Sequence, residues 1–159
     1  MARLSSRQWL LAMAALCVAA VGIALVSQHV FDMQPCPWCI LQRLVFLVVA
    51  LLCVTGALVG APVARKVFAA GALVGSLMGA TAAMYQHAVA AKSSSCALTF
   101  ADKVLAALGV EALAPWLFQV TATCADAAVS VLGVPYEYWS LALFVLLAIA
   151  SLRVLVQRT

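Results

Sequence analysis

Two cysteines separated by two residues, Cys36 and Cys39, stand immediately before a long apolar stretch of the chain. A Cys-x-x-Cys pair can form a reversible disulfide or bind a soft metal ion. We expect Cys39 to lie in the first turn of a helix, where free N–H groups and the helix dipole favour a thiolate. Arg43 follows at i+4, on the same helix face. Arg43 either extends its charge to the membrane interface or stabilises negative charge on Cys39 or on an electron acceptor beside it.

The elements that must position these residues follow from the composition of the chain, which has 159 residues, 67% hydrophobic and 9% charged. Soluble domains carry about 25% charged residues, so we expect the lipid bilayer to be the main solvent. Four apolar stretches approach the roughly 20 residues that cross a hydrocarbon core. They cover about residues 9–26, 40–59, 67–85 and 139–156.

Only helices satisfy their backbone groups in lipid within one segment, so these four stretches predict an all-α membrane protein. The expected architecture is a four-transmembrane-helix bundle that forms a single membrane domain over residues 1–159. The first apolar stretch is longer than that of a signal peptide, and no convincing cleavage site precedes the cysteines. We therefore expect it to be an uncleaved helix.

The charged residues predict how the bundle is oriented. Six basic residues lie near the termini or in the short loop of about residues 60–66, namely Arg3, Arg7, Arg65, Lys66, Arg153 and Arg158. All five acidic residues lie on the opposite side, namely Asp32, Asp102, Glu111, Asp126 and Glu137. The positive-inside rule assigns the basic side to the cytoplasm and the loops of about residues 27–39 and 86–138 to the outside. The net charge of +4 is thus a topology signal and gives no support for nucleic-acid binding.

Four cysteines lie on the outer side, namely Cys36, Cys39, Cys96 and Cys124. An even number in an oxidising compartment suggests two disulfides, and four cysteines allow three pairings. The simplest arrangement joins Cys36 to Cys39 and Cys96 to Cys124. A bridge across two residues removes little chain entropy, so we interpret the first pair as an electron carrier. Cys96 follows three serines, and we expect it to be exposed to attack by another protein.

The longer outer loop contains a stretch from Leu98 to Leu108 with helical spacing of apolar residues. It is too short and too charged to cross a bilayer, so we expect a short helix lying in the membrane interface. His87 ends the third apolar stretch. It is interpreted either as a polar cap or as a hydrogen-bond donor to a ligand at the depth of Arg43. His29 is a weaker candidate for the same role.

Taken together, these residues resemble the disulfide bond formation protein B family of bacterial inner-membrane thiol oxidases. The resemblance covers nearly the whole chain. The motifs that carry it are Cys36-Pro37-Trp38-Cys39-Ile40-Leu41-Gln42-Arg43, Tyr85-Gln86-His87, the widely spaced Cys96 and Cys124, and the approach to the fourth helix from Gly133-Val134-Pro135 to Trp139-Ser140. The four cysteines together with the arginine make the signature specific.

The resemblance implies an oxidoreductase that supports protein folding by reoxidising a periplasmic thioredoxin-fold oxidase, a DsbA-like partner. Electrons then pass to a membrane quinone, either ubiquinone or menaquinone. The implied location is the bacterial inner membrane, with both termini in the cytoplasm and the active cysteines in the periplasm.

The resemblance also implies a role for each residue. The partner's thiolate attacks the Cys96–Cys124 disulfide and is held on Cys96, and Cys124 then attacks the Cys36–Cys39 disulfide at Cys36. Cys39 remains as a thiolate against the quinone and donates electrons through a charge-transfer or covalent adduct. In the same scheme two further residues would hydrogen-bond the quinone oxygens, namely Arg43 and His87.

Three alternatives stay open from the sequence alone. A quinone-linked thiol protein of the vitamin K epoxide reductase type normally carries its Cys-x-x-Cys in a late helix, whereas this pair opens the second. A soft-metal binder would use Cys36, Cys39 and Met33 with further thiols or thioethers. Those available are scattered over three helices, namely Cys17, Cys53, Met13, Met78 and Met84, and we predict no metal site. A structural scaffold with stabilising disulfides is the third.

Overall fold

The computed structural model describes residues 5–92 and 99–157, so the expectations for Cys96, Arg3 and Arg158 fall outside the described residues. Four long helices are α1 (Ser6–Val30), α2 (Pro37–Leu58), α3 (Pro62–Ala88) and α7 (Tyr136–Val156). Between α3 and α7 lie the 3₁₀ helix η1 (Ala90–Lys92), α4 (Phe100–Leu108), α5 (Val110–Leu113), α6 (Pro115–Phe118), β1 (Ser130–Val131) and β2 (Val134–Pro135). Each long helix is apolar and long enough to cross a membrane, which confirms the predicted four-helix membrane bundle.

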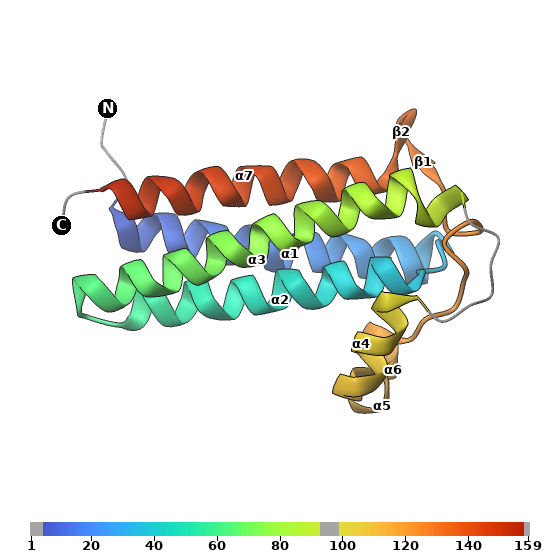
Figure 1. Cartoon of the computed structure of the whole chain (residues 1–159), viewed down its shortest axis with the longest axis horizontal. Coiled ribbons are helices and arrows are strands. Elements are labelled where there is room, and N and C mark those ends of the chain that lie inside the picture. Colours follow the sequence, from blue (N-terminus) through green and yellow to red (C-terminus); the bar gives the residue numbers. More distant parts are fainter. Residues whose placement is uncertain (1–4, 93–98, 158–159) are drawn as a thin grey trace.

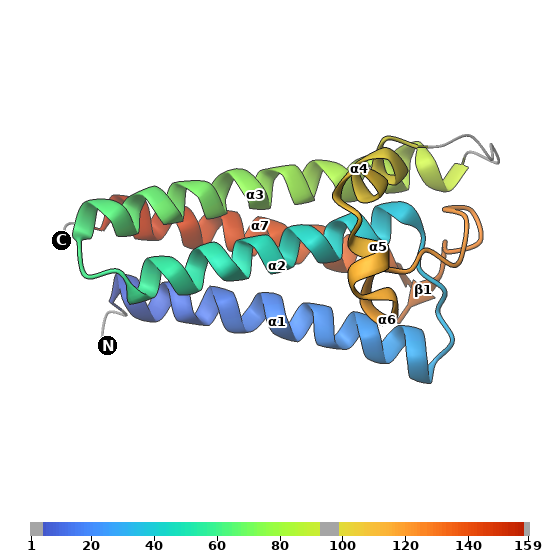
Figure 2. The same cartoon turned by 90° about the horizontal axis from the view of Figure 1, so that it is seen from below.

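The four long helices run side by side and contact one another in the cyclic order α1, α2, α3 and α7 (Figures 1 and 2). Both termini lie at the same end of the bundle as the α2–α3 connection, and α4–α6 and the β1–β2 hairpin lie at the other end. We call this second end the outer end. Cys36 at the start of α2 therefore lies at the outer end, together with residues 99–135, which carry Cys124 and which we call the outer segment.

Small residues on α3 allow its neighbours to approach closely. A Cβ atom built on Gly75 would lie 2.9 Å from Cγ2 of Val49 on α2, and one built on Gly79 would lie 2.6 Å from Cδ1 of Phe144 on α7. The Phe144 ring stacks on Phe46 with centroids 4.0 Å apart. Gly75 and Gly79 therefore allow α3 to pack closely against α2 and α7.

The outer segment folds into short elements with clear local signals. Thr99 and Asp102 form a capping box at the start of α4, and Gly109 ends that helix with a φ of 61°. The helix expected between residues 98 and 108 is thus confirmed from Phe100 onward. The β1–β2 hairpin turns at Leu132 and Gly133, both with positive φ, as a two-residue hairpin loop requires.

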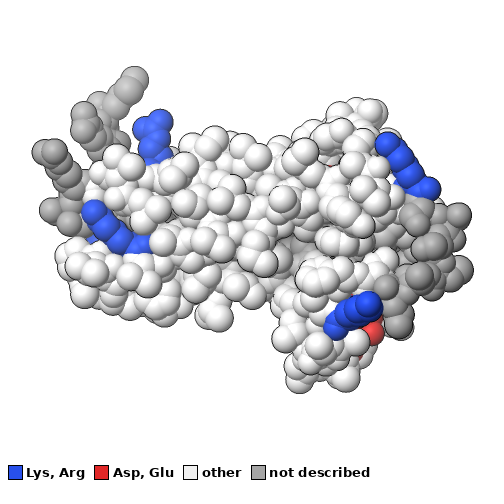
Figure 3. Space-filling view, viewed as in Figure 1, with Lys and Arg blue, Asp and Glu red and all other residues white. Residues whose placement is uncertain are grey.

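Charged side chains on the face in Figure 3 lie at the two ends of the bundle and on the α4–α6 arm, and the middle of that face carries none. Among the basic residues expected to share one side, Arg7 opens α1, Arg65 and Lys66 open α3, and Arg153 lies in the last turn of α7. All four therefore lie at the end opposite to the cysteine pair.

Candidate active site

The Cys-x-x-Cys pair forms the start of α2. Cys36 is the N-cap residue, Pro37 occupies the first helical position, and the Cys39 backbone N–H donates to the Cys36 sulfur at 3.4 Å. Proline suits that position because its missing N–H would have no helical partner. The two sulfurs lie 2.9 Å apart as free thiols that hydrogen-bond each other. Cys39 thus lies in the first turn of the helix, as the sequence predicted.

Trp38, between the two cysteines, holds this first turn against α3. Its indole is buried and lies 4.8 Å from the ring of Tyr85, centroid to centroid. It also lies 6.4 Å from the ring of Phe100 on α4. The contact with Tyr85 brings the last turns of α3 beside the cysteine pair.

Backbone hydrogen bonds of the outer segment place Cys124 next to Cys36. The carbonyl of Pro35 accepts hydrogen bonds from the N–H groups of Thr121 and Ala122, at 3.1 and 3.2 Å. These bonds tie the segment before Cys124 to the residues before α2, and Cys124 and Cys36 pack in one buried cluster. Cys36 therefore lies in contact with both of the other described outer thiols.

The Cys36 thiol hydrogen-bonds with both Cys124 and Cys39, and these bonds, together with burial, raise the pKa of Cys36. The hydrogen bond from Cys36 lowers the pKa of Cys124. Cys36 thus remains a protonated donor while Cys124 gains thiolate character. A thiolate beside a buried sulfur is the arrangement that thiol–disulfide exchange requires.

Arg43 lies one turn after Cys39 and is 6% exposed. Its Nη1 donates to Oε1 of Gln28 at 2.6 Å and to the Leu117 carbonyl at 3.1 Å, and its Nη2 donates to the Ala24 carbonyl at 3.3 Å. All three acceptors are neutral, and no carboxylate of the described chain pairs with this guanidinium. Arg43 is therefore a buried positive charge whose counter-ion must come from a nearby thiolate or from a bound molecule.

Arg43 and Cys39 line the same small cavity, of about 30 Å³, which reaches to Tyr136 at the start of α7. The donor set suits a ligand carbonyl oxygen, because it combines a guanidinium with a phenol among apolar neighbours. The cavity holds a group the size of a water molecule, so a ring-sized ligand must displace its walls. The residues therefore fit a quinone by chemistry, and the space must widen to admit one.

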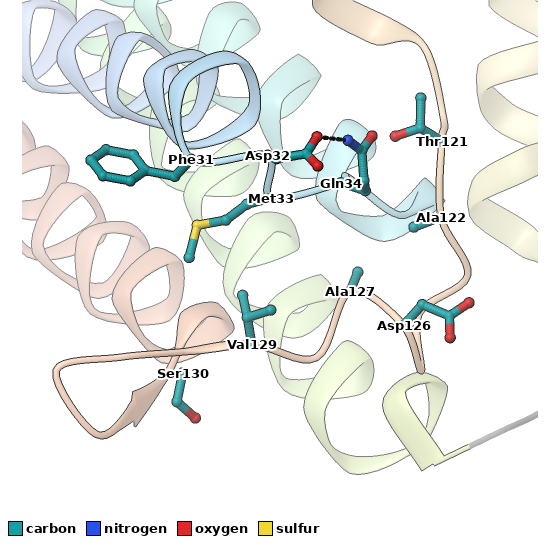
Figure 4. A pocket seen from close by; sticks show the side chains of 10 residues that line it. All are labelled: Phe31, Asp32, Met33, Gln34, Thr121, Ala122, Asp126, Ala127, Val129 and Ser130. Atoms are coloured by element: carbon teal, nitrogen blue, oxygen red, sulfur yellow. Dashed lines mark hydrogen bonds between the residues drawn. The ribbon is translucent and has the colours of Figure 1, made fainter.

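A much larger hollow, of about 710 Å³, adjoins this cavity at the outer end. Figure 4 shows residues 31–34 after α1 on one side and residues 121–130 on the other, with Asp32 accepting a hydrogen bond from Gln34. The two cavities share four lining residues, namely Met33, Gln34, Ala127 and Val129. The thiol–arginine cavity is thus continuous with the outer surface.

The two histidines lie away from the Cys39–Arg43 cavity. His87 Nδ1 lies 2.7 Å from Oε1 of the buried Glu137, and the His87 ring packs on Tyr138 at 4.6 Å. His29 lies 3.1 Å from the Trp116 carbonyl through its Nε2. Neither histidine lines the cavity that holds Cys39 and Arg43.

Three glutamines to which the sequence analysis assigned no role make polar contacts at the site. Gln86 donates through Nε2 to the Cys39 sulfur at 3.3 Å, and Gln42 donates through Nε2 to Oε1 of Gln86 at 2.6 Å. Gln28 is the partner of Arg43. A signal for all three was present in the sequence, since amides inside apolar helices are costly without a partner.

A membrane bundle in which one thiol contacts two others at one end, next to a buried arginine, defines a membrane-embedded thiol–disulfide oxidoreductase. The chain belongs to the disulfide bond formation protein B family, because the family model described as Disulfide bond formation protein DsbB matches residues 6–154. It is thus a multi-pass membrane oxidoreductase of protein disulfide formation.

Individual relatives agree with the family model. Disulfide bond formation protein B 1 of Pseudomonas syringae pv. syringae is 36% identical over 146 residues, which cover 90% of this chain and 85% of the relative. Disulfide bond formation protein B of Herminiimonas arsenicoxydans is 31% identical over 150 residues, or 94% of each chain. The protein of the same name from Ralstonia nicotianae is 30% identical over 155 residues, or 97% of this chain and 96% of the relative.

Proposed function

We propose that this oxidoreductase reoxidises a periplasmic DsbA-like dithiol oxidase and transfers the electrons to a membrane quinone. The proposed relay uses two cysteine pairs, Cys96 with Cys124 and Cys36 with Cys39. The observation that carries the proposal is the row of contacts from Cys124 through Cys36 to Cys39. Cys39, the last thiol of this row, lines the same cavity as the buried Arg43. This row leads from the outer segment to the first turn of a helix long enough to cross a membrane.

In the first exchange, a thiolate of the partner attacks Cys96. A bond forms between the partner and Cys96, the Cys96–Cys124 bond breaks, and Cys124 leaves as a thiolate. The lowered pKa of Cys124 supports this role, because a good leaving thiolate is a stable one. The partner's second thiolate then attacks the partner sulfur of the mixed disulfide. The bond to Cys96 breaks, Cys96 leaves as a thiolate, and the partner is released with its own disulfide formed.

In the second exchange, the Cys124 thiolate attacks Cys36. A Cys36–Cys124 bond forms, the Cys36–Cys39 bond breaks, and the electron pair goes to Cys39. The hydrogen bond between Cys36 and Cys124 supports this order, since the attacking and attacked sulfurs are already neighbours. Cys96 attacks Cys124 in turn, which restores the outer disulfide and frees Cys36.

Reoxidation of Cys36 and Cys39 completes the cycle, and a membrane quinone supplies the chemistry by accepting two electrons and two protons. Arg43 would hold a quinone oxygen and balance negative charge on Cys39, and its neutral hydrogen-bond partners leave its charge free for that purpose. Contact of His87 with the quinone stays a prediction, and Nε2 would have to make it because Nδ1 lies against Glu137.

For location, we propose the bacterial inner membrane, with the chain as a single membrane domain. Both termini and the α2–α3 loop would face the cytoplasm, and the outer end would face the periplasm. The basic residues Arg7, Arg65, Lys66 and Arg153 support this orientation because they lie at the end that carries both termini.

The test is oxidation of a reduced thioredoxin-fold partner by the purified protein, with and without added quinone. We expect oxidation only with quinone. Cys39→Ser should abolish quinone reduction, and Cys96→Ala should abolish the disulfide-linked complex with the partner. Cys53→Ala is the matched control, because Cys53 is buried in the bundle core, and it should keep the parent rate. If Cys39→Ser and Cys96→Ala both retain the parent rate, the relay is wrong.

A further inference from the structure

We propose that Gln86 is a catalytic residue that stabilises negative charge on Cys39, and that Gln42 is the positioning residue that aims the Gln86 amide. This inference rests on the proposed function, because it concerns the Cys39 thiolate formed when Cys36 is attacked. It adds a neutral hydrogen-bond donor to the charge that Arg43 supplies.

The three side chains form a chain of hydrogen bonds across two helices. Gln42 and Cys39 are three residues apart on α2, so they lie on one helix face. Gln86 reaches toward both from the last turns of α3. Gln86 donates to the Cys39 sulfur at 3.3 Å, and Gln42 donates to Gln86 at 2.6 Å. Both glutamines are 4% exposed, so water does not compete for these bonds.

The bond from Gln42 decides which end of the Gln86 amide faces Cys39. A carboxamide has a donor nitrogen and an acceptor oxygen, and Gln42 uses the oxygen of Gln86. The nitrogen of Gln86 must therefore point to the sulfur. A thiolate can only accept hydrogen bonds, and an N–H bond to an anion is stronger than one to a neutral group. The arrangement thus favours the thiolate of Cys39 over its thiol.

The consequence concerns the exchange at Cys36. When the Cys124 thiolate attacks, the Cys36–Cys124 bond forms, the Cys36–Cys39 bond breaks, and the electron pair remains on Cys39. The Gln86 N–H stabilises this leaving group without any proton transfer. Gln86 does not line the cavity that Cys39 shares with Arg43, so its donor remains in place while that cavity is occupied.

The test measures the equilibrium of the Cys36–Cys39 dithiol with a glutathione redox buffer, with neither quinone nor partner present. Cys96 and Cys124 are replaced by alanine in every variant, so that one redox pair remains at the outer end, and Cys17 and Cys53 in the bundle core are replaced by alanine as well. Gln86→Leu is expected to shift the equilibrium toward the disulfide by roughly tenfold at pH 8, the size of one hydrogen bond to a charged group. The shift should diminish at a pH where Cys39 is protonated, because the lost bond favours the anion.

Two further variants separate the direct effect from a structural one. Gln86→Glu keeps the size of the side chain and replaces the donor by acceptors, so it should shift the equilibrium at least as far as Gln86→Leu. Gln42→Leu should shift it in the same direction by a smaller factor, and it should add nothing to Gln86→Leu. Ser76→Ala is the matched control, because Ser76 is a buried polar residue of the same helix that bonds only the Ala72 carbonyl.

Equilibria within twofold of the parent for both Gln86 variants would overturn the proposal. A shift of equal size at every pH would also overturn it, since a packing defect does not depend on the charge of Cys39. The glutathione equilibrium requires neither partner nor quinone. A failure of quinone-dependent turnover would therefore count against the proposed function and leave the result for Gln86 intact.

Discussion

Replacing Gly79 with alanine is expected to destabilise the bundle at the point where α3 meets α7. The new Cβ would lie 2.6 Å from Cδ1 of Phe144 and still closer to Cε1 and Cζ of the same ring. Carbon atoms that do not share a bond pack at about 3.5 to 4.0 Å, so the ring would have to retreat by about 1 Å or more. It cannot retreat freely, because Phe144 is fully buried and stacked on Phe46.

The size of the effect follows from two opposing terms. Overpacking a close-packed core costs about 1 to 3 kcal/mol, and we expect the upper end because neither stacked ring has free space. Alanine regains about 1 kcal/mol through its higher helix propensity than glycine. The free energy of unfolding should therefore fall by about 2 kcal/mol. Adding Phe144→Leu to the Gly79→Ala variant should recover part of this loss. In a double-mutant cycle, the two substitutions should therefore show a coupling energy of about 1 kcal/mol.

The assay is reversible unfolding in mixed micelles that contain an increasing fraction of dodecyl sulfate. Cys17 and Cys53 serve as reporters after the outer thiols are blocked, because both are buried in the core and react with a maleimide only when the bundle opens. Gly22→Ala is the matched control, since a Cβ there meets nothing within 4 Å. A Gly79→Ala variant as stable as Gly22→Ala would refute the close approach of α3 and α7.

Three other predictions concern the outer end. Arg43→Lys keeps the charge but cannot reach all three acceptors, so the KM for quinone should rise about tenfold; an unchanged KM in quinone titrations would contradict this. Cys36→Ala removes the donor that lowers the pKa of Cys124, so the pH profile of Cys124 alkylation should move to higher pH; an unmoved profile would count against the contact. Glu137→Gln weakens the pair between the buried Glu137 and the partly exposed His87 and should cost about 1 kcal/mol of stability, measured by the same unfolding assay; parent-like stability would contradict it.

The part of the site that the sequence predicted is local. Cys36, Cys39 and Arg43 stand at the start of one helix, and their relative positions follow from helix geometry alone. The four membrane helices were predictable for a similar reason, since lipid allows the backbone few alternatives.

Contacts between helices could not be predicted, because hydropathy does not fix the rotation of a helix about its axis. Gln86 and His87 are adjacent in sequence, yet Gln86 faces Cys39 on α2 and His87 faces Glu137 on α7. Its position at the end of the third apolar stretch was reason to consider His87 at the depth of Arg43, but the direction in which its side chain points could not be predicted. The contact of Gln86 with Cys39 therefore became visible only in the folded bundle.

The backbone path of the outer segment likewise could not be predicted from the sequence. Cys124 reaches Cys36 through irregular backbone held by two hydrogen bonds to the Pro35 carbonyl. Neither propensity nor periodicity encodes such bonds. Spacing alone therefore identified the four outer cysteines as a set, and only the family resemblance implied that Cys124 meets Cys36.

The most direct test of the relay is the disulfide formed when Cys39 and Cys96 are both removed, so that neither can resolve a bond between Cys36 and Cys124. A variant with Cys39→Ser and Cys96→Ala is reduced, incubated with glutathione disulfide, and digested without reduction so that linked peptides can be identified by mass spectrometry. The account predicts that the Cys36–Cys124 disulfide accumulates, because those two sulfurs are neighbours. A Cys36 that stays unpaired, or that carries only glutathione, would contradict it.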